Sequence, residues 1–343
     1  MDQDEARRLK QQLAAYVAEL AQRGVVAEAS AVDAPRPAAV ALGLAPRLDG
    51  SYGVAVRYRL GVPGVRSVAR RVAEQVGPVA DVRRTGRIRA LAAGTDTGTG
   101  IPTPRPPVAT AQAVGETGRV RPLRPGVSIA HVDVSAGTLG AFVTVDGAVH
   151  ALSNYHVLAG SPRARTGDLV LQPGPADGGT APEDRVGTLA ATVPLVPGRT
   201  GTVDCAVALL DDPAVEPTYP VGAVTRTAVA VGGESVGKIG RTTAVTQGRV
   251  TAIELDDVVV GYGEELGELR FDDQIEVEST GGGPFSRGGD SGSLVYRADG
   301  VALGLLFAGS ETGGENGTGL TYVNPIDAVL TALGARLVGP PPA

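Results

Sequence analysis

Cysteine, tryptophan and histidine are scarce in this sequence of 343 residues, and these absences exclude several classes of protein. With Cys205 as its only cysteine, the chain cannot form an intrachain disulfide. The bridged frameworks of secreted domains are therefore excluded, and a reducing compartment is expected. Three scattered histidines and one cysteine make no set of metal ligands, so no metal site is predicted.

Long apolar runs are absent as well. No stretch reaches the roughly 18 apolar residues that a membrane-spanning helix needs. The first residues, Met1 to Glu5, are acidic and do not resemble a secretory signal peptide. The sequence therefore predicts a cytoplasmic protein with no membrane partner.

Glycine and proline are plentiful, with 49 and 25 residues, and this composition favours many short strands and tight turns. The charge is uneven: residues 1–126 hold 19 basic and 11 acidic side chains, and residues 127–343 hold 12 and 26. Because the arginines are scattered and aromatic residues are few, nucleic acid is not the predicted partner. We expect the basic part to dock onto the acidic part of the same chain.

The first 92 residues are predicted to form a small α/β domain that begins with a helix. Apolar residues recur at helical spacing over residues 5–23. An alternating run over 52–60, a helical pattern over 64–76 and a second strand over 79–91 then predict a β-α-β unit. The apolar face of the first helix is available for self-association, so a homo-oligomer formed through this domain is a hypothesis.

After a predicted linker over residues 93–124, rich in Gly, Thr and Pro, the chain consists of short strand-like runs separated by turns. These runs form two groups of about six with no crossover helices between them. This pattern favours two antiparallel six-stranded β-barrels over a parallel sheet. The predicted fold is mainly β, with the first barrel in residues 125–218 and the second in residues 219–343. A short helix is expected over 325–333.

A candidate nucleophile, Ser291, lies in the segment Gly288-Gly289-Asp290-Ser291-Gly292-Ser293, just before an apolar strand. A nucleophilic serine needs an exposed hydroxyl, a base within hydrogen-bond reach and donors for the developing oxyanion. Because glycine adopts conformations closed to other residues, the N–H groups of Gly289 and Ser291 can converge on one point. A simple turn is the alternative for this loop taken alone.

His156 is the candidate base, and Asp204 is the acid that would orient it. Apolar residues flank His156 over 152–158, apart from the polar pair at 153 and 154. His131 and His150 have the positions of ordinary strand or edge residues. Asp204 opens the apolar run 205–210, and its carboxylate needs a partner because an unpaired buried charge is strongly destabilising. The order His, Asp, Ser excludes the α/β-hydrolases, which run Ser, Asp, His. A buried structural histidine is the alternative for His156 alone.

Three segments around these residues resemble the triad motifs of the chymotrypsin/trypsin-like serine peptidases: Ser153-Asn154-Tyr155-His156, Val203-Asp204-Cys205-Ala206 and Gly289-Asp290-Ser291-Gly292. Further segments resemble a disulfide-free intracellular bacterial subgroup that includes the narrow-leaf-type proteins of plants: Arg121-Pro122-Leu123-Arg124-Pro125-Gly126, Gly237-Lys238-Ile239-Gly240-Arg241-Thr242-Thr243 and Val323-Asn324-Pro325-Ile326. The similarity spans about residues 120–335. It implies two barrels with the three catalytic side chains in the cleft between them.

The resemblance also implies a substrate site. Phe285 stands where trypsins have an acidic pocket base, so the pocket is expected to take an apolar or small side chain. Phe307, Ala308 and Gly309 resemble the edge strand that pairs with the substrate backbone. No Ile-Val-Gly-Gly activation sequence precedes the first barrel, so Asp290 needs another cation or hydrogen-bond donors, and the candidate residues are Arg287, Arg121 and Arg124.

The sequence therefore predicts a serine endopeptidase that hydrolyses a peptide or protein substrate through an acyl-enzyme, without a cofactor. Two alternatives remain open: a protease-fold scaffold that has lost turnover, and a nucleotide-binding regulatory oligomer. The second arises because residues 232–238 fit the first seven positions of a phosphate-binding P-loop. The next residue, Ile239, lacks the hydroxyl that would contact magnesium.

Overall fold

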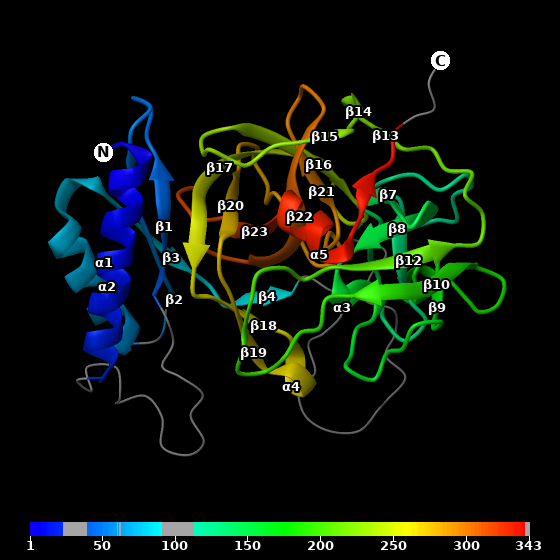
Figure 1. The fold of residues 1–343 in the computed structure, drawn as a ribbon, viewed down its shortest axis with the longest axis horizontal. Coiled ribbons are helices and arrows are strands. Elements are labelled where there is room, and N and C mark those ends of the chain that lie inside the picture. Colours follow the sequence, from blue (N-terminus) through cyan, green and yellow to red (C-terminus); the bar gives the residue numbers. More distant parts are fainter. Residues whose placement is uncertain (23–39, 60, 62, 91–112, 340–343) are drawn as a thin grey trace.

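The computed structural model describes residues 1–22, 40–59, 61, 63–90 and 113–339. Leu91 and most of the predicted linker over 93–124 lie outside the described residues. The helices are α1 (Gln3–Gln22), α2 (Pro63–Val76), α3 (Tyr155–Leu158), α4 (Gly263–Leu266) and α5 (Ile326–Leu333). Strands make up most of the remaining regular structure, so the fold is mainly β (Figure 1).

Six strands of the second half close into a barrel of antiparallel pairings. They are β16 (Ser235–Gly240), β17 (Ala244–Asp256), β20 (Gln274–Ser279), β21 (Leu294–Tyr296), β22 (Val301–Ser310) and β23 (Leu320–Pro325). The ring of neighbours runs β16–β17–β20–β23–β22–β21 and returns to β16. Between β17 and β20 the chain inserts a hairpin of β18 (Val258–Gly261) and β19 (Glu268–Phe271). This insertion lies near the candidate site.

The first half forms a second antiparallel sheet. Its strands are β5 (Ser128–His131), β6 (Gly137–Thr138), β7 (Ala141–Val145), β8 (Ala148–Ser153), β9 (Leu169–Leu171), β10 (Arg185–Thr192), β12 (Ala206–Leu210) and β24 (Arg336–Leu337). Other two-residue strands are β11 (Thr200–Gly201), β13 (Thr218–Tyr219), β14 (Gly222–Ala223) and β15 (Arg226–Thr227).

The expectation of a second closed barrel needs correction, because this sheet is a half-barrel. Its order is β24–β7–β8–β12–β10–β9–β5–β6, with β6 and β7 toward opposite ends. These two strands follow one another on the chain but bond to different neighbours. Leu139 donates to the carbonyl of Val127 beside β5, whereas Gly140 donates to the carbonyl of Leu152 in β8. Among the described strands no pairing joins β6 to β7 or β24, so the ring of strand pairings stays open.

The N-terminal strands extend the sheet of the second barrel. They are β1 (Ala41–Pro46), β2 (Tyr52–Arg59), β3 (Ala80–Thr85) and β4 (Ile88–Ala90). β2 and β3 are parallel with α2 between them, and β1 pairs antiparallel with β17. β1 was not expected from the sequence. Its residues are buried on both faces, so apolar and polar residues do not alternate along it. The strand expected over 79–91 divides near Gly86, and its two parts join different neighbours.

The apolar face of α1 packs inside the chain. Leu13 and Leu20 are buried in one cluster with Val54 and Val56 of β2 and Val68 of α2. The two helices thus cover the face of the N-terminal strands, as Figure 1 shows at the left of the molecule. This burial supplies the stabilisation that an isolated helix of this length lacks.

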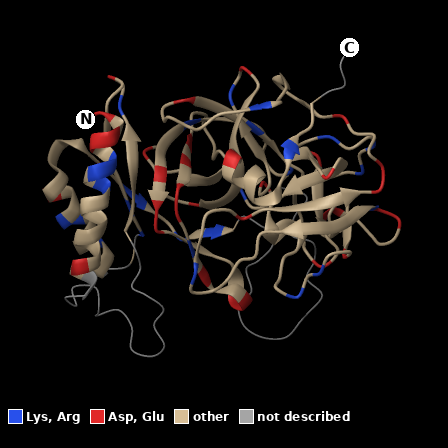
Figure 2. Ribbon diagram, viewed as in Figure 1, with Lys and Arg blue, Asp and Glu red and all other residues tan. Residues whose placement is uncertain are grey.

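Ion pairs join the N-terminal part to the second barrel. Figure 2 shows acidic residues on β17 and β20 next to basic residues of the N-terminal elements. These pairs include Arg57 with Glu276 at 2.7 Å, Arg83 with Glu278 at 2.6 Å, and Arg7 with Glu254 at 2.7 Å. Arg57 and Glu276 are both fully buried, so their charges compensate one another in the interior. This is the docking of basic onto acidic residues that the charge distribution predicted.

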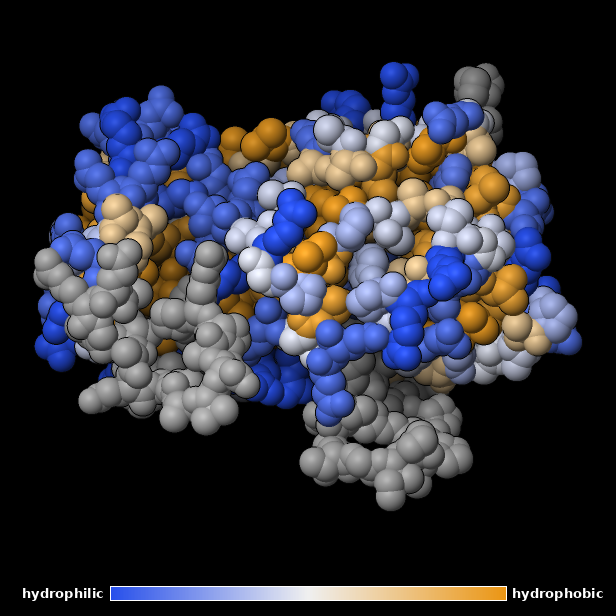
Figure 3. All heavy atoms as spheres, turned by 60° about the horizontal axis from the view of Figure 1, so that its bottom comes forward, coloured by the Kyte–Doolittle hydropathy of each residue, from blue (hydrophilic) through white to orange (hydrophobic). Residues whose placement is uncertain are grey.

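On the face shown in Figure 3, apolar side chains are divided into separate patches by polar ones. Within the described ranges, no helix combines the length and the apolar character needed to cross a membrane.

Candidate active site

His156 and Asp204 meet where β8 ends and β12 begins. The antiparallel register places Ser153 of β8 opposite Ala206 of β12, so the residues just beyond these two positions are neighbours. His156 lies in α3, which follows β8, and its Nδ1 is 2.5 Å from Asp204 Oδ2. His156 is 6% exposed and Asp204 is fully buried. A buried carboxylate on the imidazole fixes the orientation of the ring.

Two asparagines hold the backbone of Asp204. Asn154, which precedes α3, donates from Nδ2 to the carbonyl of Asp204 at 2.7 Å. Asn324 of β23 accepts from the N–H of Asp204 at 2.9 Å. Both belong to segments that carried the resemblance, although the sequence assigned neither a role. Asp204 is thereby held by residues from both halves of the chain.

Tyr262, just after β18, is a site residue that the sequence did not indicate. Its hydroxyl donates to Asp204 Oδ2 at 2.6 Å, and its ring meets the His156 ring edge-on with 5.8 Å between centroids. Burial, followed by the charge of Asp204, raises the pKa of Tyr262 well above its usual value, so the hydroxyl remains a donor. Further rings continue the stack through Phe271 to Phe307. No local pattern marks a tyrosine at a strand end as a ligand of a distant aspartate.

Replacing Tyr262 with phenylalanine is expected to lower kcat about tenfold with little change in KM, because the ring remains but Asp204 loses a donor to its charged form. Steady-state kinetics on a peptide substrate measures the effect. Tyr155→Phe is the matched control, since the Tyr155 hydroxyl bonds to no residue that the structure describes. Equal losses of kcat in both variants would contradict this role of Tyr262.

Ser291 is fully buried, in contrast to the exposed hydroxyl expected of the nucleophile, and lies against the segment that leads to His156. Its carbonyl oxygen accepts from the N–H of Thr138 at 2.8 Å, and its Oγ lies 3.4 Å from the carbonyl oxygen of Phe307. Gly292 has φ +94°, and a Cβ there would lie 2.0 Å from Ser153 Oγ, so only glycine permits this approach. His156 Nε2 is buried and has no hydrogen-bond partner among the residues that the structure describes. The structure thus joins His156 to Asp204 and brings the Ser291 loop to the same junction, without a His156–Ser291 hydrogen bond.

The glycines before Ser291 present their carbonyls to two threonines. Thr138 Oγ1 donates to the carbonyl of Gly289 at 2.8 Å, and Thr242 Oγ1 donates to that of Gly288 at 2.7 Å. Gly289 has φ +97°, a conformation that favours glycine. The N–H groups of Gly289 and Ser291 donate to no group in the part of the chain that the structure describes. These two donors are therefore unused by the protein itself.

Asp290 has a buried lysine as its counter-charge, which corrects the expectation of an arginine. Lys238 Nζ lies 3.4 Å from Asp290 Oδ2, and both side chains are fully buried. Burial lowers the pKa of Lys238, and Asp290 opposes that shift. Arg287 supplies only its backbone N–H, at 2.9 Å. The other two candidates are bonded elsewhere, Arg121 to Gln172 and Arg124 to Glu116.

Further donors complete the carboxylate shell of Asp290. They are the N–H of Thr242 at 2.9 Å, the N–H of Thr243 at 3.1 Å and the Thr243 hydroxyl at 2.8 Å. Lys238 was also the lysine of the P-loop-like segment. Its burial in β16, against Asp290, leaves it no access to a phosphate group.

The residues expected to bind substrate fall into two places. Phe307 and Ala308 of β22 are fully buried in the cluster that also contains Phe271, and Gly309 follows them. Phe285 is 2% exposed and belongs to a different cluster, with Val250 and Val277 of the second barrel. Phe285 therefore packs in the barrel interior, and Phe307 packs toward the tyrosine that contacts His156.

The sequence matches no protein-family model and no curated protein. Similar solved structures include a glutamic-acid-specific serine protease, which is 24% identical with a TM-score of 0.43 and covers 63% of this chain and 100% of its own. Thermobifida fusca protease A is 21% identical with a TM-score of 0.44, over 64% of this chain and 99% of its own. Cellulomonas bogoriensis chymotrypsin is 22% identical with a TM-score of 0.43, over 64% and 99%. These three neighbours are chymotrypsin/trypsin-like serine proteases.

Proposed function

We propose that the protein is a serine endopeptidase whose catalytic triad is His156, Asp204 and Ser291. The observation that carries the proposal is the buried contact of His156 Nδ1 with Asp204 Oδ2, which leaves His156 Nε2 without a partner among the described residues. A histidine that served only structure would normally have both ring nitrogens satisfied in such a buried place. An unpaired Nε2 is what a general base requires before its substrate arrives.

Asp204 accepts the Nδ1–H of His156, so the lone pair of the ring lies on Nε2. Nε2 removes the proton of Ser291 Oγ as that oxygen attacks the peptide carbonyl. The hydroxyl, which lies 3.4 Å from the carbonyl oxygen of Phe307, must first turn toward the ring. His156 then passes the proton to the leaving amine, and water releases the acyl-enzyme by the same route in reverse.

The negative oxygen of the tetrahedral intermediate needs donors that the protein does not already use. The N–H groups of Gly289 and Ser291 meet this condition, because neither donates to a described group. The carbonyl in the same peptide unit as the Gly289 N–H is that of Gly288, and it accepts from Thr242 Oγ1. Removing one such donor in a known peptidase costs about 100- to 1000-fold in kcat. No cofactor takes part in these steps.

Reaction with a fluorophosphonate tests the proposal, because this small reagent needs an activated serine and no substrate contacts. We expect one adduct, located on Ser291 by mass spectrometry, and none in the Ser291→Ala variant. Ser286→Ala is the control: this serine lies in the same loop but bonds to Thr321, and the variant should still be labelled. Absence of any adduct on the folded wild type would support the scaffold alternative and contradict the triad.

A further inference from the structure

A strand of the N-terminal part lies on the edge of β22 beside Ser291. β4 pairs antiparallel with β22, and the register sets Ile88, Arg89 and Ala90 opposite Ser310, Gly309 and Ala308. The residue before Ala308 is Phe307, whose carbonyl oxygen is 3.4 Å from Ser291 Oγ. Pairing of this kind is how a sheet edge holds an extended peptide. β4 therefore lies where a substrate backbone would have to bind.

The direction of β4 is also that of a substrate. Along β4 the chain runs from the position opposite Ser310 to the position opposite Ala308, and so toward Phe307 and Ser291. A peptide in the same place would bring the carbonyl at its C-terminal end toward the nucleophile. This is the orientation that attack on the acyl side of a scissile bond requires.

β18 forms the second wall of the space that β4 occupies beside β22. The sheet order β18–β4–β22 sets β4 between two strands, with Gly261 of β18 opposite Arg89 in a parallel pairing. The residue after Gly261 is Tyr262, the donor to Asp204. A peptide bound here would thus contact the same hairpin that supports the His156–Asp204 pair.

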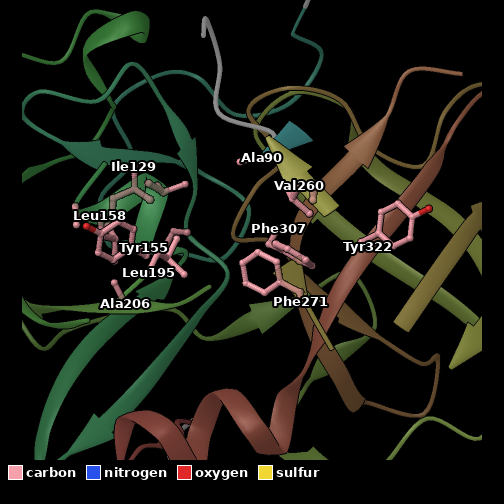
Figure 4. Close-up of a cluster of buried hydrophobic side chains, with 14 of the residues drawn as sticks. Ala90, Ile129, Tyr155, Leu158, Leu195, Ala206, Val260, Phe271, Phe307 and Tyr322 are labelled. Carbon is pink, nitrogen blue, oxygen red and sulfur yellow. The ribbon is translucent and has the colours of Figure 1, made fainter. Parts of the chain in front are cut away.

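The side chains of β4 enter the apolar cluster between the two halves. Ala90 is 8% exposed and belongs to one buried cluster with Val260 and Phe307, as Figure 4 shows near the gap between the two groups of side chains. Ile88, two residues earlier and so on the same face of the strand, packs against this cluster. A methyl group fills the position of Ala90, so a bound peptide is expected to carry a small residue there.

Two contacts hold β4 in place at its N-terminal side. The N–H of Gly86 donates to the carbonyl of Thr312 at 3.0 Å, and Thr85 forms an isolated bridge with Gly313. Both partners follow β22 directly. The connection from β3 is therefore attached along the extension of the same edge that β4 occupies.

We propose that the space between β22 and β18 is the binding site for the acyl-side segment of an extended peptide, and that β4 fills this site from within the chain. The enzyme is then latent toward peptides until β4 leaves. The inference depends on the proposed function, because it names the ligand and the regulation of the same site.

Two reagents distinguish a failure of this inference from a failure of the proposed function. A small fluorophosphonate needs only the activated serine, whereas a tripeptidyl phosphonate must also pair with β22. In the wild type we expect the first to react readily and the second slowly. The Ile88→Asp/Ala90→Asp variant introduces two charges into the apolar cluster and should expel β4. It is expected to react with the peptidyl reagent at least about tenfold faster, because a larger fraction of the molecules has β22 free to pair with the peptide.

The matched control is Ile88→Val/Ala90→Ser, which changes each side chain by one heavy atom without adding a charge and should behave as the wild type. Amide hydrogen exchange at Ala308–Ser310 is the second measurement, and only the charged variant should exchange faster there. Equal peptidyl labelling of the wild type and the charged variant would overturn the inference, and so would unprotected amides on the wild-type edge. If neither reagent labels any folded variant, the proposed function fails instead, while hydrogen exchange still decides whether β4 covers β22.

Discussion

The Asp204→Asn variant is expected to lose about four orders of magnitude in kcat while it keeps the native fold. Asp204 Oδ2 accepts from His156 Nδ1 at 2.5 Å and from the Tyr262 hydroxyl at 2.6 Å, and Oδ1 faces the N–H of His156 at 3.4 Å. Every group around the carboxylate is thus a donor. An amide has one oxygen and one NH₂ group, so it cannot accept at both places.

Either orientation of the amide damages the site. With its oxygen on His156 Nδ1, its NH₂ faces the backbone N–H of His156. With its NH₂ on Nδ1, the ring must carry its proton on Nε2, and no lone pair remains for Ser291. In both cases the charge that stabilises the imidazolium in the transition state is lost. The second orientation keeps the amide NH₂ away from the backbone N–H of His156. We therefore expect the tautomer with its proton on Nε2 to dominate.

Steady-state kinetics on a peptide substrate, with circular dichroism to check the fold, measures this loss. Asp168→Asn is a closely matched control, because Asp168 also faces a histidine, with 3.2 Å between its Oδ2 and His131 Nε2, away from the proposed triad. That variant should keep kcat within about twofold, in line with a surface substitution. A loss of less than tenfold in Asp204→Asn would contradict the role assigned to His156.

The second large effect is expected at the buried ion pair of Lys238 with Asp290, the residue before Ser291. Lys238→Met is expected to lower the free energy of unfolding by about 3 to 5 kcal/mol, because it leaves the Asp290 carboxylate buried without a cation. Four hydrogen-bond donors remain on that carboxylate, but none carries a full charge. The loop that holds Ser291 would relax toward water, so activity should fall together with stability.

A double-mutant cycle separates the charge from the packing. Asp290→Asn in the Lys238→Met background removes the uncompensated charge, so the double variant should be more stable than the sum of the two single losses predicts. Urea denaturation of all four proteins measures each free energy of unfolding. Additive losses would show that the lysine contributes by packing alone, and the counter-charge role would then be wrong.

Local patterns predicted much of the regular structure. Periods of two and 3.6 residues predicted β2, α2 and the strands of both halves, because those periods follow from backbone geometry within one element. β1 escaped detection, since a strand buried on both faces has no alternation to detect. Whether a ring of strand pairings closes depends on how strands far apart in the chain pair, which no period reveals.

The sequence by itself determined which side chains are available for hydrolysis. Three histidines, one acid at the start of an apolar run and one glycine-bracketed serine leave few combinations, and His156 and Asp204 are indeed in contact. Tertiary structure alone decided that Lys238 faces Asp290, that Tyr262 bonds to Asp204 and that β4 covers β22. These contacts join segments far apart in the chain, and they form only because strand register and chain crossing bring particular side chains together. The spacing of residues along the sequence does not predict which distant segments come into contact, whereas the packed fold determines each contact.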